Sequence, residues 1–250
     1  MTLARVRAEI HTWGTVIFID AASFRISESD IQSAIDKVQE FLFLVDTLFS
    51  TYKESSEVSR LRRGEISITD CSPDLQEVWD LCTYAKKVTD GSFDPWCVEG
   101  GFDPSGYVKG WASDRAIAML RSDGVEHIQI NAAGDLSLAG GVEPGKPWSI
   151  GIRHPEEAHT IAKVFDITNG AIATSGTYER GSHIKDPHTG LIAIGARSAT
   201  VYGPDGGLAD ALATALIVAG KDGAYLFQKP ELAGYHCWVI ERHSDEAWAI

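Results

Sequence analysis

Cysteine is scarce in this chain of 250 residues, and its four cysteines lie far apart, with no C-x-x-C pair among them. So few thiols do not build a disulfide framework in a chain of this length, and free thiols are typical of a reducing compartment. Long apolar runs are also absent. No stretch approaches the length of a membrane span, and the N-terminal residues lack the apolar segment that a signal peptide needs. We therefore expect a cytoplasmic protein without a membrane span.

Positive charge is the second scarcity. Lys and Arg number 22 against 35 Asp and Glu, which gives a formal net charge of −13. An acidic chain without a basic patch repels phosphate backbones, so we expect no nucleic-acid partner, although a metal ion and a few donors can still hold a nucleotide. The 44% of hydrophobic residues suffice for a substantial core. With no linker or low-complexity tract, residues 1–250 are predicted to form a single domain.

The spacing of apolar residues predicts a mixture of helices and strands. Helices are expected at 29–49 with Ser29 as N-cap, from Ser72 to before Gly91, from Lys109 to Arg121, and at 208–220. Strands are expected at 15–20, 127–135, 147–155, 163–176, 198–204 and 236–242. Helices mixed with strands that look antiparallel predict an α+β fold around one core.

Residues 140–147, GGVEPGKP, nearly match a phosphate-binding P-loop through Gly140, Gly145 and Lys146. The position that should supply a metal-binding hydroxyl is Pro147, and a strand rather than a helix is expected to follow. A phosphate site therefore lacks both its hydroxyl and its helix N-terminus. The favoured interpretation is a hairpin loop between two strands.

Two histidine pairs share the same spacing, His183 with His188 and His154 with His159. A zinc site needs three or four convergent ligands, and the thiols of this chain are scattered. Surface or hydrogen-bonded histidines are therefore the favoured interpretation, and a zinc site is the lesser alternative.

Asp210 and Thr214 lie four residues apart on an otherwise apolar predicted helix, so their side chains share one face. One interpretation is structural: an Asp in the first turn is favoured by the helix dipole, and the Thr bonds back to a carbonyl. The other is a hard-cation site of one carboxylate, one hydroxyl, carbonyls and water, which suits Mg²⁺ when the ion also holds a phosphate.

A polar stretch at 91–114 carries Asp103 in a Pro-containing loop and Lys109 at the expected start of a helix. Asp-Pro is common in turns, so Asp103 alone indicates little. A Lys at a helix start opposes the helix dipole, which hints at an anionic partner. Farther along, Ala133-Gly134-Asp135 is predicted to form a tight hairpin turn.

Eight segments occur in an order that matches one protein family. They are WGT (13–15), FSTYKESSEVSRL (49–61), GSFDP (91–95), FDPSGYVKGWASDRA (102–116), INAAGD (130–135), PWSIGIRHP (147–155), AIATSGTYERGSHIKDPHTG (171–190) and ADALATAL (209–216). In this the chain resembles the ApbE family of FAD:protein FMN transferases, and most of all the short type found in actinobacteria. It departs from the family pattern at Trp13, in the residues between Asp103 and Lys109, and at Ala133, and these changes spare the charged positions.

The resemblance implies an ApbE-like (T-fold-like) core with largely antiparallel sheets, flanking helices and a central FAD cleft. It implies an enzyme that uses Mg²⁺ to move the FMN moiety of FAD to a Thr or Ser hydroxyl of an acceptor protein, releasing AMP. The residues leave two alternatives open. One is a Mg²⁺-dependent FAD pyrophosphatase that yields FMN and AMP, and the other is a flavin-binding or carrier protein without turnover.

The resemblance also implies roles for particular residues. Its metal ligands correspond to Asp210, Thr214 and the backbone carbonyl of Val108. His183 matches the histidine of the H-x-x-D-P-x-T-G run and is expected near the phosphates or the acceptor hydroxyl. In that position it could act as a general base. The residues expected to contact FAD in the same cleft are His183, Tyr52, Asp103, Lys109, Thr174, Ser175 and Gly176. Asp186, Thr189 and Gly190 are expected to shape their loop.

Overall fold

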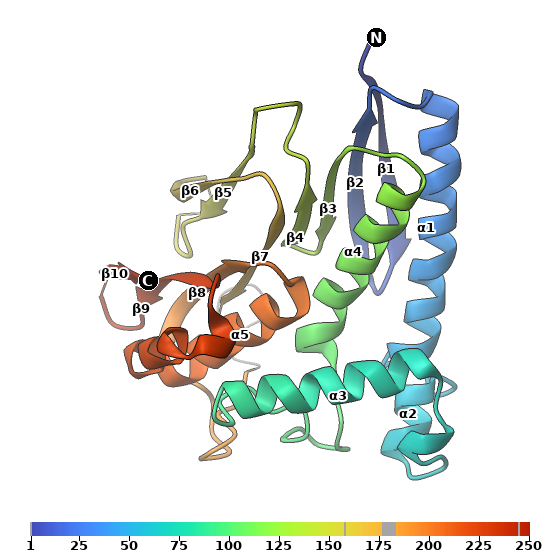
Figure 1. Cartoon of the computed structure of the whole chain (residues 1–250). Helices are drawn as coiled ribbons and strands as arrows, with labels where there is room; N and C mark the ends of the chain where they lie inside the picture. Colours follow the sequence, from blue (N-terminus) through green and yellow to red (C-terminus); the bar gives the residue numbers. More distant parts are fainter. Residues whose placement is uncertain (1, 158, 177–183, 245) are drawn as a thin grey trace.

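The computed structural model describes residues 2–157, 159–176, 184–244 and 246–250. Within these residues, an eight-stranded sheet has the order β1-β2-β3-β4-β7-β8-β9-β10, and a separate two-stranded sheet pairs β5 with β6. Every pairing is antiparallel, and the large sheet stays open (Figure 1). The α+β prediction with largely antiparallel sheets is therefore confirmed.

Most of the strands lie where the alternation of apolar residues predicts them. In chain order they are β1 Ala4–Thr12, β2 Thr15–Ser23, β3 His127–Ala132, β4 Asp135–Ala139, β5 Trp148–Arg153, β6 Ile161–Ile167, β7 Gly170–Gly176, β8 Ala196–Gly203, β9 His236–Glu241 and β10 Ala247–Ala249. The expected strand 163–176 is in fact two strands in different sheets, because the chain turns at Asn169-Gly170, where Gly170 has φ 120°. The expected strands do not include β1, β4 or β10.

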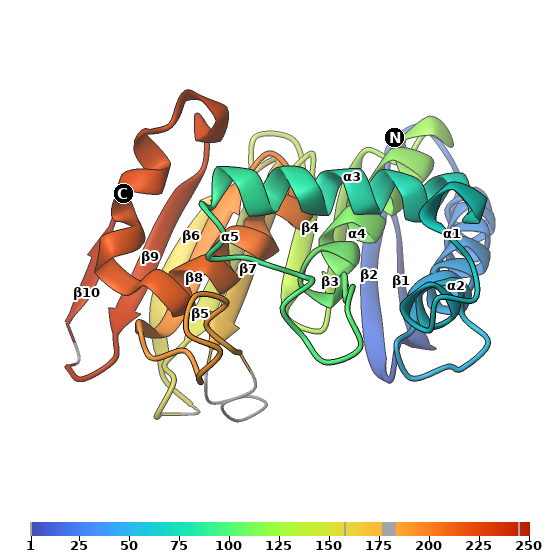
Figure 2. The same ribbon diagram turned by 90° about the horizontal axis from the view of Figure 1, so that it is seen from below.

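Helices cover one face of the large sheet. They are α1 Glu28–Phe49, α2 Glu57–Arg62, α3 Pro73–Val88, α4 Ser105–Ser122 and α5 Gly206–Ala219, with 3₁₀ segments at Ile68–Asp70, Gly220–Gln228 and Pro230–Leu232. α4 and α5 pack on the central strands, and α3 crosses both of them on the outside (Figure 2). In the part of the chain that the structure describes, no helix has both the length and the apolar character needed to cross a bilayer.

Three helix starts differ from the prediction; α5 begins at Gly206 rather than at residue 208. α1 is capped by Ser27, whose hydroxyl accepts from Asp30 N–H in a capping box, so the expected cap at Ser29 is wrong by two residues. α4 begins at Ser105, with a kink at Gly106, and this places Lys109 in the second turn. The opposition between Lys109 and the helix dipole is therefore weaker than expected, since the dipole acts mainly within the first turn.

The opposite face of the sheet carries the β5–β6 hairpin. Trp148, Ile150 and Ile152 of β5 pack with Leu138 and Ile172 of the large sheet in a second, smaller apolar core. Residues 140–147 lead into this hairpin and turn at Gly141 (φ 70°), where Val142 N–H donates to Lys146 O over 2.8 Å. They connect strands in two different sheets, so this segment is a connection and the hairpin-loop interpretation is corrected.

Candidate active site

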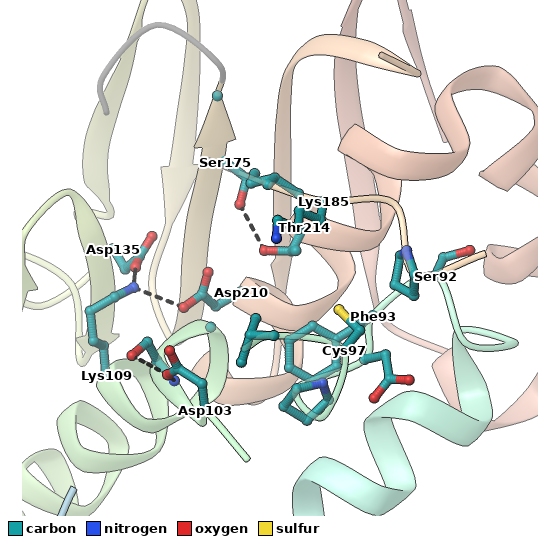
Figure 3. Close-up of a pocket in the computed structure, with 18 of the residues that line it drawn as sticks. Ser92, Phe93, Cys97, Asp103, Lys109, Asp135, Ser175, Lys185, Asp210 and Thr214 are labelled. Carbon is teal, nitrogen blue, oxygen red and sulfur yellow. Dashed lines mark hydrogen bonds and ion pairs between the residues drawn. The ribbon is translucent and has the colours of Figure 1, made fainter. Parts of the chain in front are cut away.

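A cavity of about 250 Å³ opens where α4, α5 and the ends of β4 and β7 meet (Figure 3). Segments far apart in the sequence form its walls. They are the loop 92–98, the start of α4, the β3–β4 turn, the end of β7, residues 184–187 and the inner face of α5. Seven candidates lie at positions that line it: Asp103, Lys109, Thr174, Ser175, Gly176, Asp210 and Thr214.

The Lys109 ammonium lies between two carboxylates at the base of this cavity (Figure 3). Its Nζ donates to Asp135 Oδ2 and, over 2.8 Å, to Asp210 Oδ2. The side chains of Lys109, Asp135 and Asp210 are 21%, 10% and 7% exposed. Burial acts to lower the pKa of Lys109, but the two carboxylates outweigh it and hold that pKa above its ordinary value. Lys109 is therefore a fixed cation at neutral pH.

Each member of this cluster is placed by a different local feature. Asp210 is the only charged residue of α5, an apolar helix whose other side chains are almost all buried. Asp135 begins β4 directly after the tight turn at Ala133 (φ 57°) and Gly134 (φ 101°), which confirms the predicted hairpin turn. Such left-handed conformations suit two-residue hairpin turns. The turn therefore aims Asp135 at Lys109.

Hydroxyl groups form the next wall of the cavity. Ser175 Oγ and Thr214 Oγ1 are 3.1 Å apart and share a hydrogen bond. Thr174 N–H donates to Asp135 Oδ1 over 3.3 Å, and Thr174 Oγ1 shares a hydrogen bond of 2.9 Å with Thr200 Oγ1. Because Thr214 stands one helical turn after Asp210, α5 presents a carboxylate and a hydroxyl to the same space.

The remaining candidates lie at the rim of the cavity, away from it, or outside the described residues. Asp103 lies at the rim, where its Oδ1 accepts from Ser105 N–H over 3.0 Å. Val108 is buried within α4, and Tyr52 is 96% exposed in the loop after α1; neither lines the cavity. The catalytic candidate His183 lies outside the described residues, so its predicted role stays a prediction.

The loop after His183 is held by its own side chains, as predicted. Asp186 Oδ1 accepts from His188 N–H and Asp186 Oδ2 accepts from Thr189 Oγ1, both over 2.8 Å. Gly190 has φ 73°, which allows the chain to reverse. His188 is exposed outside the cavity, while Lys185 and Pro187 of the same loop line it.

The predicted site lacks three charged residues that line this cavity: Asp94, Asp135 and Lys185. The sequence predicts Asp135 only as part of a turn, although an Asp directly after a turn is a usable signal when a lone Lys109 needs an anionic partner. Lys185 also lines the cavity. It lies in a polar loop, and no periodicity distinguishes a lysine that faces a cavity from one that faces water. Asp135 joins the candidates because the tertiary structure brings it to Lys109, and Asp94 and Lys185 join because they line the same cavity.

The donor set at α5 fits a hard cation. Asp210, Thr214 and Ser175 offer only oxygen atoms, which Mg²⁺ prefers. Among the described residues, no three His, Cys, Asp or Glu side chains converge as metal ligands. Mg²⁺ commonly binds through one or two carboxylates together with substrate phosphates and water. A sparse protein ligand set of this kind therefore suits Mg²⁺ with a phosphate substrate better than a closed structural metal site.

Sequence comparison identifies relatives of this chain. The profile of the ApbE family matches residues 13–99 and 99–237. The FAD:protein FMN transferase of Rhodobacter capsulatus is 38% identical over 128 residues, covering 48% of this chain and 24% of the relative. That of Escherichia coli K12 is 30% identical over 150 residues, covering 56% and 43%. The matched region thus spans less than half the length of these curated relatives.

Structural comparison extends the likeness to the whole chain. The flavin transferase ApbE of Vibrio cholerae has a TM-score of 0.83 at 23% identity and covers 100% of this chain and 97% of its own. The ApbE protein of Thermotoga maritima has a TM-score of 0.81 at 24% identity and covers 94% of each chain. At these identities the comparison shows a shared fold.

Proposed function

The chain belongs to the ApbE family, and on that basis we propose that it is an FAD:protein FMN transferase. In this reaction an acceptor protein gains the FMN moiety of FAD through a phosphoester bond to a Thr or Ser hydroxyl, and AMP is released. The acceptor oxygen bonds to the phosphorus that carries riboflavin, the pyrophosphate bond breaks, and the hydroxyl proton passes to a base. Relatives that align with this chain carry the name of this activity.

One observation carries the proposal: a cation, two carboxylates and two hydroxyls converge in one cavity from α4, α5, β4 and β7. Phosphoryl transfer demands little covalent chemistry from a protein, and its catalysis is mostly positioning and charge stabilisation. A fixed ammonium among ordered oxygen donors meets that requirement. Thr174 and Ser175, which line the same cavity as Lys109, are proposed to contribute hydroxyl or N–H donors to the phosphate oxygens.

We propose that Asp210 and Thr214 hold Mg²⁺, with Ser175 beside them. The family pattern adds the backbone carbonyl of Val108 to this proposal, although Val108 itself does not line the cavity. When bound, the ion would neutralise charge on the pyrophosphate. Because Lys109 donates to Asp210, it fixes the orientation of that carboxylate and balances the charge of Asp135. Lys109 then contributes positive charge beside the phosphates.

The remaining assignments in this proposal concern proton transfer and flavin contacts. His183 is proposed as the base that accepts the proton of the acceptor hydroxyl. Asp103 and Gly176 border the cavity and are proposed to contact FAD. Tyr52 is proposed to pack on a ring of FAD; its high exposure leaves its aromatic face open to a ligand.

The test is incubation of the purified protein with FAD, MgCl₂ and a candidate acceptor domain. We expect an acceptor band with flavin fluorescence that survives denaturing electrophoresis, and AMP in equal amount. Asp210→Ala should abolish both. The matched control is Asp222→Ala, which removes an exposed carboxylate just beyond α5 and should change neither.

The two alternatives give different outcomes in the same experiment. FMN and AMP without a fluorescent acceptor would indicate a pyrophosphatase. FAD that stays intact with both Mg²⁺ and acceptor present would indicate a flavin-binding protein. Either result, obtained with an acceptor that a known transferase modifies, contradicts the proposal.

A further inference from the structure

Asp114 is a partly buried carboxylate of α4 that the proposed chemistry does not use. Its Oδ1 accepts a hydrogen bond from Ser137 Oγ over 2.5 Å, and its Oδ2 accepts from Gly206 N–H over 2.6 Å. Gly206 is the first residue of α5, so its N–H has no partner within the helix. A single side chain thus joins α4 to both β4 and α5.

These three elements are the ones that carry the charged cluster of the cavity. Lys109 precedes Asp114 on α4, Asp135 precedes Ser137 on the same face of β4, and Asp210 follows Gly206 by one helical turn. The hydrogen bonds of Asp114 therefore form a second layer directly behind the bonds of Lys109. A movement of α5 relative to α4 would have to change both layers together.

The two helices approach each other closely, and Tyr107 of α4 packs against Gly207 of α5 beside the crossing. α4 and α5 cross at glycines: a Cβ on Gly110 would lie 2.2 Å from Gly206 C, and one on Gly206 would lie 3.2 Å from Gly110 Cα. The glycines allow this close approach but contribute no side chains of their own. Beside the crossing, the hydrogen bonds of Asp114 specify the position of Gly206 by direction as well as by shape.

We infer that Asp114 is a positioning residue, which fixes α5 against α4 and β4 so that Asp210 meets Lys109 in the geometry needed for transfer. This inference rests on the proposed function for its kinetic consequence, and on the structure alone for the coupling between the two layers. Asp114 does not touch the cavity. Its effect passes through the placement of Asp210 and Thr214.

The first test compares two substitutions of Asp114. Asp114→Ala removes both hydrogen bonds, and a displacement of about 1 Å at the site costs on the order of a hundredfold in rate, so kcat should fall by roughly tenfold to a hundredfold with little change in KM for FAD. Asp114→Asn keeps an acceptor for Gly206 N–H and can donate to Ser137 Oγ. It should retain kcat within about threefold, because position rather than charge is what Asp114 supplies.

The matched control is Asp205→Ala. Asp205 is the N-cap of the same helix and accepts from Leu208 N–H over 2.6 Å, a hydrogen bond that joins it to α5 itself. Its removal should lower thermal stability and leave kcat unchanged at temperatures where the variant is folded. Equal losses of kcat in Asp205→Ala and Asp114→Ala would show that Asp114 only stabilises the start of α5, and would overturn the inference.

The second test needs no substrate and separates this inference from the proposed function. In a double-mutant cycle on the unfolding equilibrium, Asp114→Ala and Asp210→Asn should couple by roughly threefold or more in the equilibrium constant, above the error of additivity for independent sites. Asp123→Ala, at the exposed end of α4, should combine additively with Asp210→Asn.

These results have separate meanings. Additivity between Asp114 and Asp210 would overturn the positioning role even if flavin transfer is confirmed. Coupling in a protein that transfers no flavin would support the positioning role and contradict the proposed function. If Asp114→Ala does not fold, Ser137→Ala replaces it in both tests, since it removes only one of the two hydrogen bonds.

Discussion

The two faces of β4 hold their neighbours by different means, although the helix-covered face of the large sheet as a whole buries the main apolar core. Leu136 and Leu138 point to the β5–β6 hairpin and join an apolar core. Asp135 and Ser137, alternating with them, face the helices and bond to Lys109 and Asp114. The apolar face needs only shape and hydrophobicity, whereas the polar face depends on specific partners, because each buried polar group left unpaired is costly.

The largest expected effect comes from breaking the polar face at Lys109. Lys109→Met leaves two carboxylates side by side without their cation. Loss of one charged donor at a reaction site lowers flavin transfer by about 10²-fold to 10³-fold. We also expect a loss of about 2 kcal/mol in unfolding free energy, less than for a fully buried pair because Lys109 retains some exposure. Urea unfolding and in-gel flavin fluorescence measure the two effects.

Lys37→Met is the control for this substitution. Lys37 forms an exposed ion pair with Asp123 over 2.9 Å, so its removal should change stability by less than about 1 kcal/mol. A Lys109→Met variant with wild-type transfer would show that the charged cluster is not part of the reaction site.

Trp148→Ala breaks the apolar face instead. Trp148 is 5% exposed in the small core under the hairpin, and truncation of a buried Trp costs about 3–5 kcal/mol. We expect a lower thermal midpoint, with kcat for flavin transfer unchanged where the variant is folded. Calorimetry combined with kinetics below the transition measures both. A loss of kcat without a loss of stability would mean that the two faces are not independent.

The smallest effect concerns the pH dependence of stability at Asp114. Burial raises the pKa of Asp114 to about 6 from the usual 3.8, against hydrogen bonds from Ser137 and Gly206 that lower it. The folded state thus binds this proton more tightly than the unfolded state, so this contribution to stability is present below pH 4 and is lost as pH rises through 6. Asp114→Asn removes that loss, which amounts to at most about 3 kcal/mol.

The measurement is the difference in unfolding free energy between Asp114→Asn and the wild type over a pH series. Taking the difference cancels the contribution of the other carboxylates to the pH dependence, because both proteins share them. The difference should increase in favour of the variant between pH 4 and 6 and become constant above pH 7. Parallel curves for the two proteins would contradict a raised pKa at Asp114.

Sequence patterns predicted the fold where a local cause was sufficient. The Ser-Pro start of α3 at Ser72-Pro73, the apolar helix around Asp210 and the turn at Ala133-Gly134 are all confirmed. Prediction failed where the same local signal was compatible with two structures. Ser27 and Ser29 both suit a cap, and only the bond to Asp30 selects the first. The segment 140–147 is bounded by strands, but nothing local shows that the two strands belong to different sheets.

Periodicity predicted the mixed fold, and a spacing of four residues predicted that Asp210 and Thr214 share one helix face, because both signals act between near neighbours in the chain. Three features came from the packing alone: Asp135 faces Lys109, Lys185 lines the cavity, and Asp114 lies behind the charged cluster. These contacts join residues on α4, β4 and α5. Their partners are chosen by how sheet and helices pack, because a buried charge or hydrogen-bonding group needs a partner but does not specify from which part of the chain it comes.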